Sequence, residues 1–95
     1  MPAYLIAEVD VTNPTAYEDY KKLAPAAIAR HGGRYLVRGG ASETLEGPAM
    51  THRMVILQFE SMEQARGFYH SPEYTAAREK RKDAASARFV IVEGL

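Results

Sequence analysis

The run of residues 51–59 constrains the fold most, because it is strand-like and apolar on both of its faces. Successive side chains of a strand point to opposite faces. One face receives Arg53, Val55, Leu57 and Phe59, and the other receives His52, Met54, Ile56 and Gln58. A strand that is apolar on both faces must be covered on both. We therefore predict a central strand with helices against one face and a second covering layer against the other.

Length and charge limit the classes of protein that this chain fits. Its 95 residues are enough for one domain, 1–95, with a two-layer core. Lys plus Arg and Asp plus Glu number 12 each, so no net charge favours nucleic acid or an anionic membrane as a partner. No membrane-spanning apolar run or basic leader is visible, so we expect a cytoplasmic protein. The absence of cysteine excludes disulfides and thiolate chemistry.

The remaining elements follow from periodicity and capping residues. Residues 3–11, 34–38 and 88–93 alternate as strands. A helix is predicted from Pro14 to the glycine pair at 32–33, with Pro25 expected to kink or split it. Ser61 and Ser71 are N-cap candidates for a short second helix and for a third segment that runs to about residue 85. The order is β-α-β-β-α-β, an α+β pattern that places the helices on one face of a four-stranded antiparallel sheet.

The strand patterns also predict which side chains lie under the helices. The most aliphatic faces are Leu5/Ala7/Val9/Val11, Val55/Leu57/Phe59 and Val90/Val92, and these are expected to meet the helices. The open face then carries Ile6, Glu8, Leu36, Arg38, His52, Met54, Ile56, Gln58, Phe89 and Ile91. So large an apolar patch is unusual on a monomer. A two-fold homodimer with these faces packed together covers it and encloses a cavity with polar walls.

Four segments carry a resemblance to a known family: residues 32–40 (GGRYLVRGG), 46–47 (EG), 71–74 (SPEY) and 90–94 (VIVEG). Together they resemble the domain-of-unknown-function 1330 family, over essentially the whole chain and in the right order. The resemblance implies the ferredoxin-like fold of the dimeric α/β-barrel group, and hence a homodimer. That family has no settled reaction, and the wider group includes small monooxygenases, isomerases and ligand-binding dimers.

Two groups of side chains are candidates for a site. As catalytic residues we take His52, whose imidazole suits proton transfer, and Glu8, the carboxylate expected to be most buried. As substrate-binding residues we take Arg38 and Arg53, whose guanidinium groups suit a carboxylate, and Tyr20, Tyr69 and Tyr74, whose hydroxyls orient a ligand. Each has a structural alternative: ion pairs for the arginines, a satisfied core histidine, and core tyrosines with hydrogen-bonded tips.

Other signals point to no cofactor and no metal. The three histidines lie on different elements without ligand spacing, and no phosphate loop, dinucleotide motif or nucleophile elbow is present. Two hypotheses remain. The first is a dimer that binds a small anionic or aromatic molecule, either as a binding protein or with cofactor-independent monooxygenase- or isomerase-like chemistry. The second is a non-catalytic dimer with a structural or regulatory role.

Overall fold

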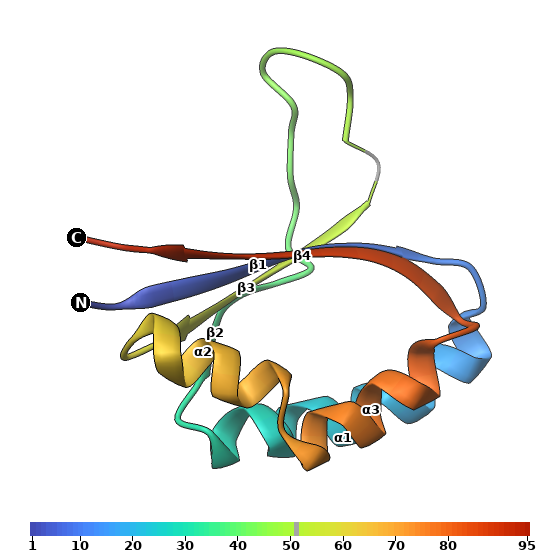
Figure 1. The fold of residues 1–95 in the computed structure, drawn as a ribbon. Coiled ribbons are helices and arrows are strands. Elements are labelled where there is room, and N and C mark those ends of the chain that lie inside the picture. Colours follow the sequence, from blue (N-terminus) through green and yellow to red (C-terminus); the bar gives the residue numbers. More distant parts are fainter. Residues whose placement is uncertain (51) are drawn as a thin grey trace.

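The computed structural model describes residues 1–50 and 52–95. An antiparallel sheet has the strand order β2-β3-β1-β4, and its helices cover one face only (Figure 1). The strands are β1 (Ala3–Val11), β2 (Arg34–Arg38), β3 (Arg53–Phe59) and β4 (Ala85–Glu93), and the helices are α1 (Pro14–Arg30), α2 (Met62–Tyr69) and α3 (Pro72–Arg81). This confirms the predicted α+β architecture. Thr51, which we expected to begin the third strand, lies outside the described residues.

Side-chain caps begin all three helices where the sequence predicts them. The Asn13 side chain accepts a hydrogen bond from the Ala16 amide, and Ser61 and Ser71 accept from the amides of Gln64 and Tyr74, each at 3.1 Å. Pro25 does not split α1, which continues to Arg30 because Ala27 and Ile28, just beyond it, are buried in the core. Of the expected kink or split at Pro25, the split was therefore wrong.

The core lies between the helices and the sheet, and β1 and β3 turn the predicted faces toward it. Leu5, Ala7, Val9, Leu57 and Phe59 are all buried there. Strand β4 begins three residues earlier than predicted, because Ala85 pairs with Val11 and continues the ladder to the end of β1. No helix in the described ranges is long and apolar enough to cross a membrane.

The facing that we predicted for β4 was wrong. Directly paired residues of neighbouring strands share a face, and Phe89 pairs with Ala7 while Ile91 pairs with Leu5. Phe89 and Ile91 therefore pack against the core, and Val90 and Val92 lie on the open face with 39% and 45% of their surface exposed. Both sets are apolar, so alternation alone did not distinguish them.

A bulge in β2 reverses the facing expected for Arg38. Tyr35 pairs with Leu57 and Val37 pairs with Ile56, so Leu36 is the extra residue between them. The pairing after the bulge places Arg38 opposite Val55, on the helix side of the sheet. Arg38 therefore does not line the open face, and Leu36 stays 46% exposed at the sheet edge.

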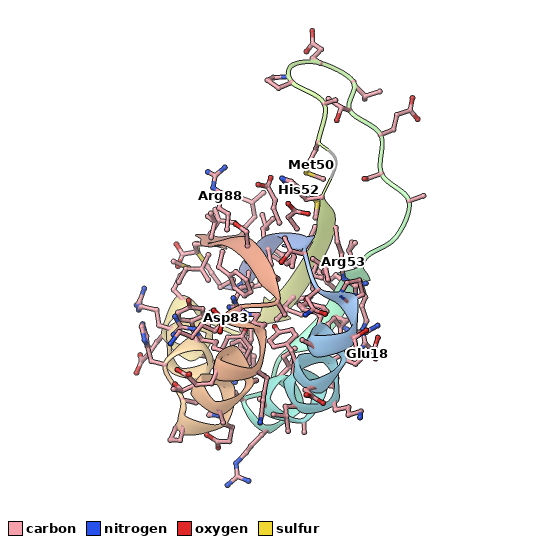
Figure 2. The ribbon with its side chains drawn as sticks, turned by 90° about the vertical axis from the view of Figure 1, so that its right-hand side faces the viewer. Glu18, Met50, His52, Arg53, Asp83 and Arg88 are labelled. Carbon is pink, nitrogen blue, oxygen red and sulfur yellow. The ribbon has the colours of Figure 1, made fainter. Side chains whose placement is uncertain are left out.

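The connection between β2 and β3 is a long arm, defined as its described residues 39–50. It extends away from the helix layer, on the side of the open sheet face (Figures 1 and 2). Residues 39–49 are all exposed, and the Thr44 hydroxyl accepts a hydrogen bond from the Met50 amide at 3.0 Å. The arm begins directly after Arg38, and β3 begins at Arg53, so these two arginines lie at its base.

Candidate functional site

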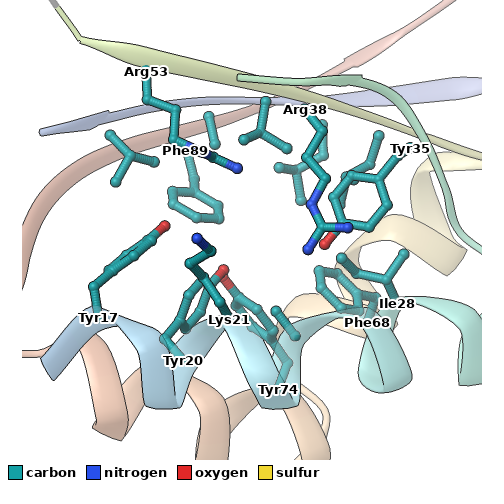
Figure 3. A pocket seen from close by; sticks show the side chains of 16 residues that line it. Tyr17, Tyr20, Lys21, Ile28, Tyr35, Arg38, Arg53, Phe68, Tyr74 and Phe89 are labelled. Carbon is teal, nitrogen blue, oxygen red and sulfur yellow. The ribbon is translucent and has the colours of Figure 1, made fainter. Parts of the chain in front are cut away.

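A cavity lies between the helix layer and the covered face of the sheet (Figure 3). All four strands and all three helices contribute to its lining, and most of the lining side chains are apolar or aromatic. Its volume is about 40 Å³, which is enough for about three water molecules. A larger molecule can enter only if side chains at the edge of the cavity move outward.

Three cationic side chains line this cavity: Lys21, Arg38 and Arg53. The Lys21 ammonium forms an ion pair with Glu18 at 3.3 Å. The Arg38 guanidinium lies over the Tyr35 ring, 4.6 Å from its centroid. Within the described ranges, neither Arg38 nor Arg53 has an ion-pair partner, and no carboxylate or imidazole lines the cavity. The cavity is therefore positively charged.

Arg53 has the most unusual environment of the three. Its Nε atom is buried and has no hydrogen-bond partner among the described residues. A buried donor without a partner costs about 1–3 kcal/mol. Arg53 is directed from the sheet toward the side chains of α1 (Figure 3). A ligand oxygen at this position would satisfy the donor.

Gly39 makes the position of Arg53 possible. Its φ is +65°, a conformation that favours glycine, and its amide donates to the Met54 carbonyl at 2.9 Å. A Cβ atom there would lie 2.8 Å from Arg53 Nη1. The glycine therefore supplies both the turn into the arm and the space that the guanidinium occupies.

Opposite the arginines, the helices contribute a pair of tyrosine hydroxyls. The hydroxyl oxygens of Tyr20 on α1 and Tyr74 on α3 are 2.7 Å apart. Arg81 Nη2 donates to the Tyr74 oxygen at 3.4 Å, and the Arg81 guanidinium lies over the Phe89 ring at 4.7 Å. Burial and the neighbouring Tyr74 raise the pKa of Tyr20, and burial raises that of Tyr17, so both stay protonated at neutral pH.

The structure brings together four of the seven site residues expected from the sequence: Arg38, Arg53, Tyr20 and Tyr74 line the cavity. Tyr69 packs behind the wall, with its ring 5.6 Å from that of Tyr74 and under the Arg78 guanidinium at 4.5 Å. The cavity that we expected between two open sheet faces is therefore not where these side chains meet.

The two expected catalytic residues lie on the opposite face of the sheet. Glu8 is 3.9 Å from Arg88, and His52 Nδ1 is 4.0 Å from Asp10. They line a shallow hollow at the base of the arm, on the side of the sheet away from the helices (Figure 2). The sheet separates them from the arginine and tyrosine cavity, so the two groups do not form one site.

Several functional candidates were missed from the sequence. Tyr17, Lys21 and Tyr35 line the cavity, and Arg81 contacts its tyrosine pair. Helical spacing placed Tyr17 beside Tyr20, but it gave no reason to connect either with Arg81 on a helix more than fifty residues away. Alternation already placed Tyr35 on the side of the sheet away from Leu36, and what it did not show was that the bulge brings Arg38 to the same side, over the Tyr35 ring.

The chain was compared with family models, with curated proteins and with solved structures. A family model described as Domain of unknown function (DUF1330) matches residues 2–95. None of the curated proteins matches the chain. A protein of unknown function from Rhodopseudomonas palustris is similar in structure, with a TM-score of 0.75 and 22% identity over 99% of this chain and 82% of that chain.

Two further solved structures have the same fold. A cofactor-independent oxygenase from Streptomyces nogalater has a TM-score of 0.71 and 12% identity, over 99% of this chain and 93% of that chain. A dimeric protein of unknown function from Bacteroides fragilis, with a ferredoxin-like fold, has a TM-score of 0.62 and 15% identity, over 98% and 96%. At these identities the likeness establishes the ferredoxin-like fold.

Proposed function

The chain belongs to the DUF1330 family, and we propose that it binds a small organic anion in the cavity under its helices. The observation that carries the proposal is the buried, unpartnered Nε of Arg53 beside Arg38, in a cavity lined by no carboxylate among the described residues. Proteins rarely leave a buried polar donor without a hydrogen-bond acceptor. An anionic group of a ligand supplies both the missing charge and the missing acceptor.

The walls of the cavity specify the rest of the ligand. Tyr17, Tyr35, Phe68 and Phe89 present ring surface to it. Aromatic walls favour a flat or apolar body. Because the cavity is small as it stands, such a body enters only when a cationic side chain moves outward, and Arg38 is the exposed member of the set. The ligand class is therefore a compact carboxylate or phenolate.

Paired probes that differ only in charge test this proposal. Benzoate and benzamide have nearly the same shape, and only benzoate is an anion at neutral pH. We expect benzoate to raise the melting temperature and to give saturable calorimetric binding, and benzamide to do neither at equal concentration. Pyruvate and pyruvamide give the same comparison for a smaller ligand. Equal responses to the charged and the neutral member of each pair would contradict the proposal.

We also propose that the protein is a homodimer joined through the open sheet face. Exposed Val90 and Val92 adjoin half-buried Ile6 and Ile56 on that face, and the fold is shared with a protein described as dimeric. Glu8 and Arg88 add both signs of charge to it, which suits a face that meets a copy of itself.

The dimer is tested by adding a charge at the centre of the proposed interface. Ile56→Lys is expected to shift the protein to monomer in sedimentation at micromolar concentration, because an unpaired buried charge costs several kcal/mol. Leu23→Lys is the matched control, since Leu23 is 41% exposed on α1, away from the sheet. A dimeric Ile56→Lys variant would place the interface elsewhere.

A second candidate function is oxygenation of the bound anion without a cofactor. The shared fold with an oxygenase of this kind supports it. Two arginines would stabilise negative charge on an ionised substrate before oxygen attacks it. Oxygen consumption with electron-rich phenols distinguishes this candidate from binding alone. If neither turnover nor binding is found, the alternative of a non-catalytic structural or regulatory dimer gains support.

A further inference from the structure

We propose that the Tyr20 and Tyr74 hydroxyls form a donor subsite, so that the cavity prefers anions that carry an oxygen acceptor away from their charged group. The inference rests on the proposed function, because it assumes that the anionic group meets Arg38 and Arg53. Those arginines come from the sheet and the two tyrosines come from the helices, with the cavity between them (Figure 3). A ligand held by the arginines therefore presents its other end to the hydroxyls.

The tyrosine pair has a hydroxyl hydrogen that it does not use in its own hydrogen bond. Each hydroxyl has one hydrogen, and the contact of 2.7 Å between the two oxygens uses one of the two. Arg81 only donates, and its bond to Tyr74 therefore uses an oxygen lone pair and no hydroxyl hydrogen. Any contact of Arg81 with the Tyr20 oxygen likewise uses a lone pair of that oxygen and no hydroxyl hydrogen. One hydroxyl hydrogen is therefore left to donate, whichever tyrosine carries it.

The surroundings keep this donor in place. Tyr74 is 1% exposed, and its ring lies 4.5 Å from Phe68 and 6.3 Å from Phe89. The Arg81 guanidinium faces Tyr20, Tyr74 and Phe89, and no carboxylate of the described residues forms an ion pair with it. Its positive charge disfavours a positively charged group near the hydroxyls. The subsite therefore suits a carbonyl, ether or hydroxyl oxygen and rejects an amine.

Ligand pairs in which an oxygen replaces a methyl group test the preference directly. We use para-acetylbenzoate against para-isopropylbenzoate, and pyruvate against isobutyrate, which cover a long and a short spacing between anion and acceptor. In whichever pair binds, calorimetry is expected to show that the oxygen-bearing member binds about threefold to tenfold more tightly, the effect of one net hydrogen bond. An equal or reversed preference would overturn the inference while leaving anion binding intact.

Variants of the two tyrosines give a pattern that a structural role would not produce. Tyr20→Phe and Tyr74→Phe each remove one hydroxyl and leave the other with a free hydrogen, so each single variant should keep the preference. The double variant has lost both hydroxyl donors, and its preference should fall to about one. Its affinity for isopropylbenzoate or isobutyrate is the internal reference, because the phenyl rings still fill the same space, and only the ratio of the two affinities within each ligand pair is compared. A preference that persists in the double variant would exclude the pair as its source.

The failure of this inference is distinguishable from failure of the proposed function. If none of the four probes binds the wild-type protein, the anion site itself is wrong and the donor subsite falls with it. If the probes bind with no oxygen preference, only the donor subsite is wrong. A melting temperature for each variant without ligand, at fixed protein concentration, shows whether a change in affinity reflects a change in folding.

Discussion

Replacing Arg53 with methionine should affect stability and binding in opposite directions. Methionine keeps a long flexible side chain but removes the charge and the Nε donor, which is buried and has no hydrogen-bond partner among the described residues. An unsatisfied buried donor costs about 1–3 kcal/mol. Arg53 is only half-buried, so we take the lower end, and Arg53→Met should stabilise the ligand-free protein by about 1 kcal/mol. For a domain of this size that raises the melting temperature by about 4–8 °C.

The same change should weaken binding of the anion. A hydrogen bond to a charged group contributes about 1.5–3 kcal/mol, so the dissociation constant for benzoate or pyruvate should rise roughly 10- to 150-fold. Arg34→Met is the matched control. Arg34 is the first residue of β2, at the end of that strand away from the arm. It is exposed and donates to the Gln58 side chain at 2.9 Å on the open face. Its replacement should change stability by less than about 0.5 kcal/mol and leave affinity unchanged.

The assay is thermal unfolding followed by calorimetric titration, with both variants at the same protein concentration. The opposite signs separate a binding role from a structural one, because a structural arginine should destabilise the protein when it is removed. Lower stability of Arg53→Met with unchanged affinity would refute the reasoning. Higher stability with unchanged affinity would mean that the arginine is strained but that the anion binds elsewhere.

Three further predictions use the same probes. Arg38→Lys keeps the charge but loses the paired donors, so the binding free energy of the anion should weaken by about 1–3 kcal/mol in calorimetry. An unchanged affinity would favour a purely structural role for the cation–π contact of Arg38 with Tyr35. His52→Gln should leave the affinity for the anion unchanged, because His52 lies across the sheet from the cavity. A large loss of affinity would show that His52 contributes to the binding site. Because the folded-state pKa of Tyr20 is raised above its unfolded value, stability should decrease as the pH rises above about 10, where the unfolded state releases the proton first. Denaturant unfolding of Tyr20→Phe should show a shallower decline, and an identical decline would contradict the burial of that hydroxyl.

Local sequence determined the elements and most of their ends. The caps at Asn13, Ser61 and Ser71 depend on one side chain and an amide three residues later, so they form wherever a helix begins at that position. The facing of β1 was also predictable, since its buried positions alternate, and so was that of the end of β3, where Leu57 and Phe59 are buried and Gln58 between them is not. Tyr20 and Tyr74 were identified as binding candidates because their helix faces were expected to meet the sheet, whereas Arg53 was identified because a guanidinium group suits a carboxylate.

Tertiary structure decided which of these side chains share a site. Strand β4 is apolar on both faces, so only its register against β1, with Phe89 opposite Ala7, fixed the facing. The bulge at Leu36 moved Arg38 to the helix side, and this depends on pairing with β3, which periodicity within β2 does not encode. Tyr20, Tyr74 and Arg81 meet because α1 packs against α3. Alternation is a property of one strand alone, whereas a site depends on which neighbours each strand and helix has.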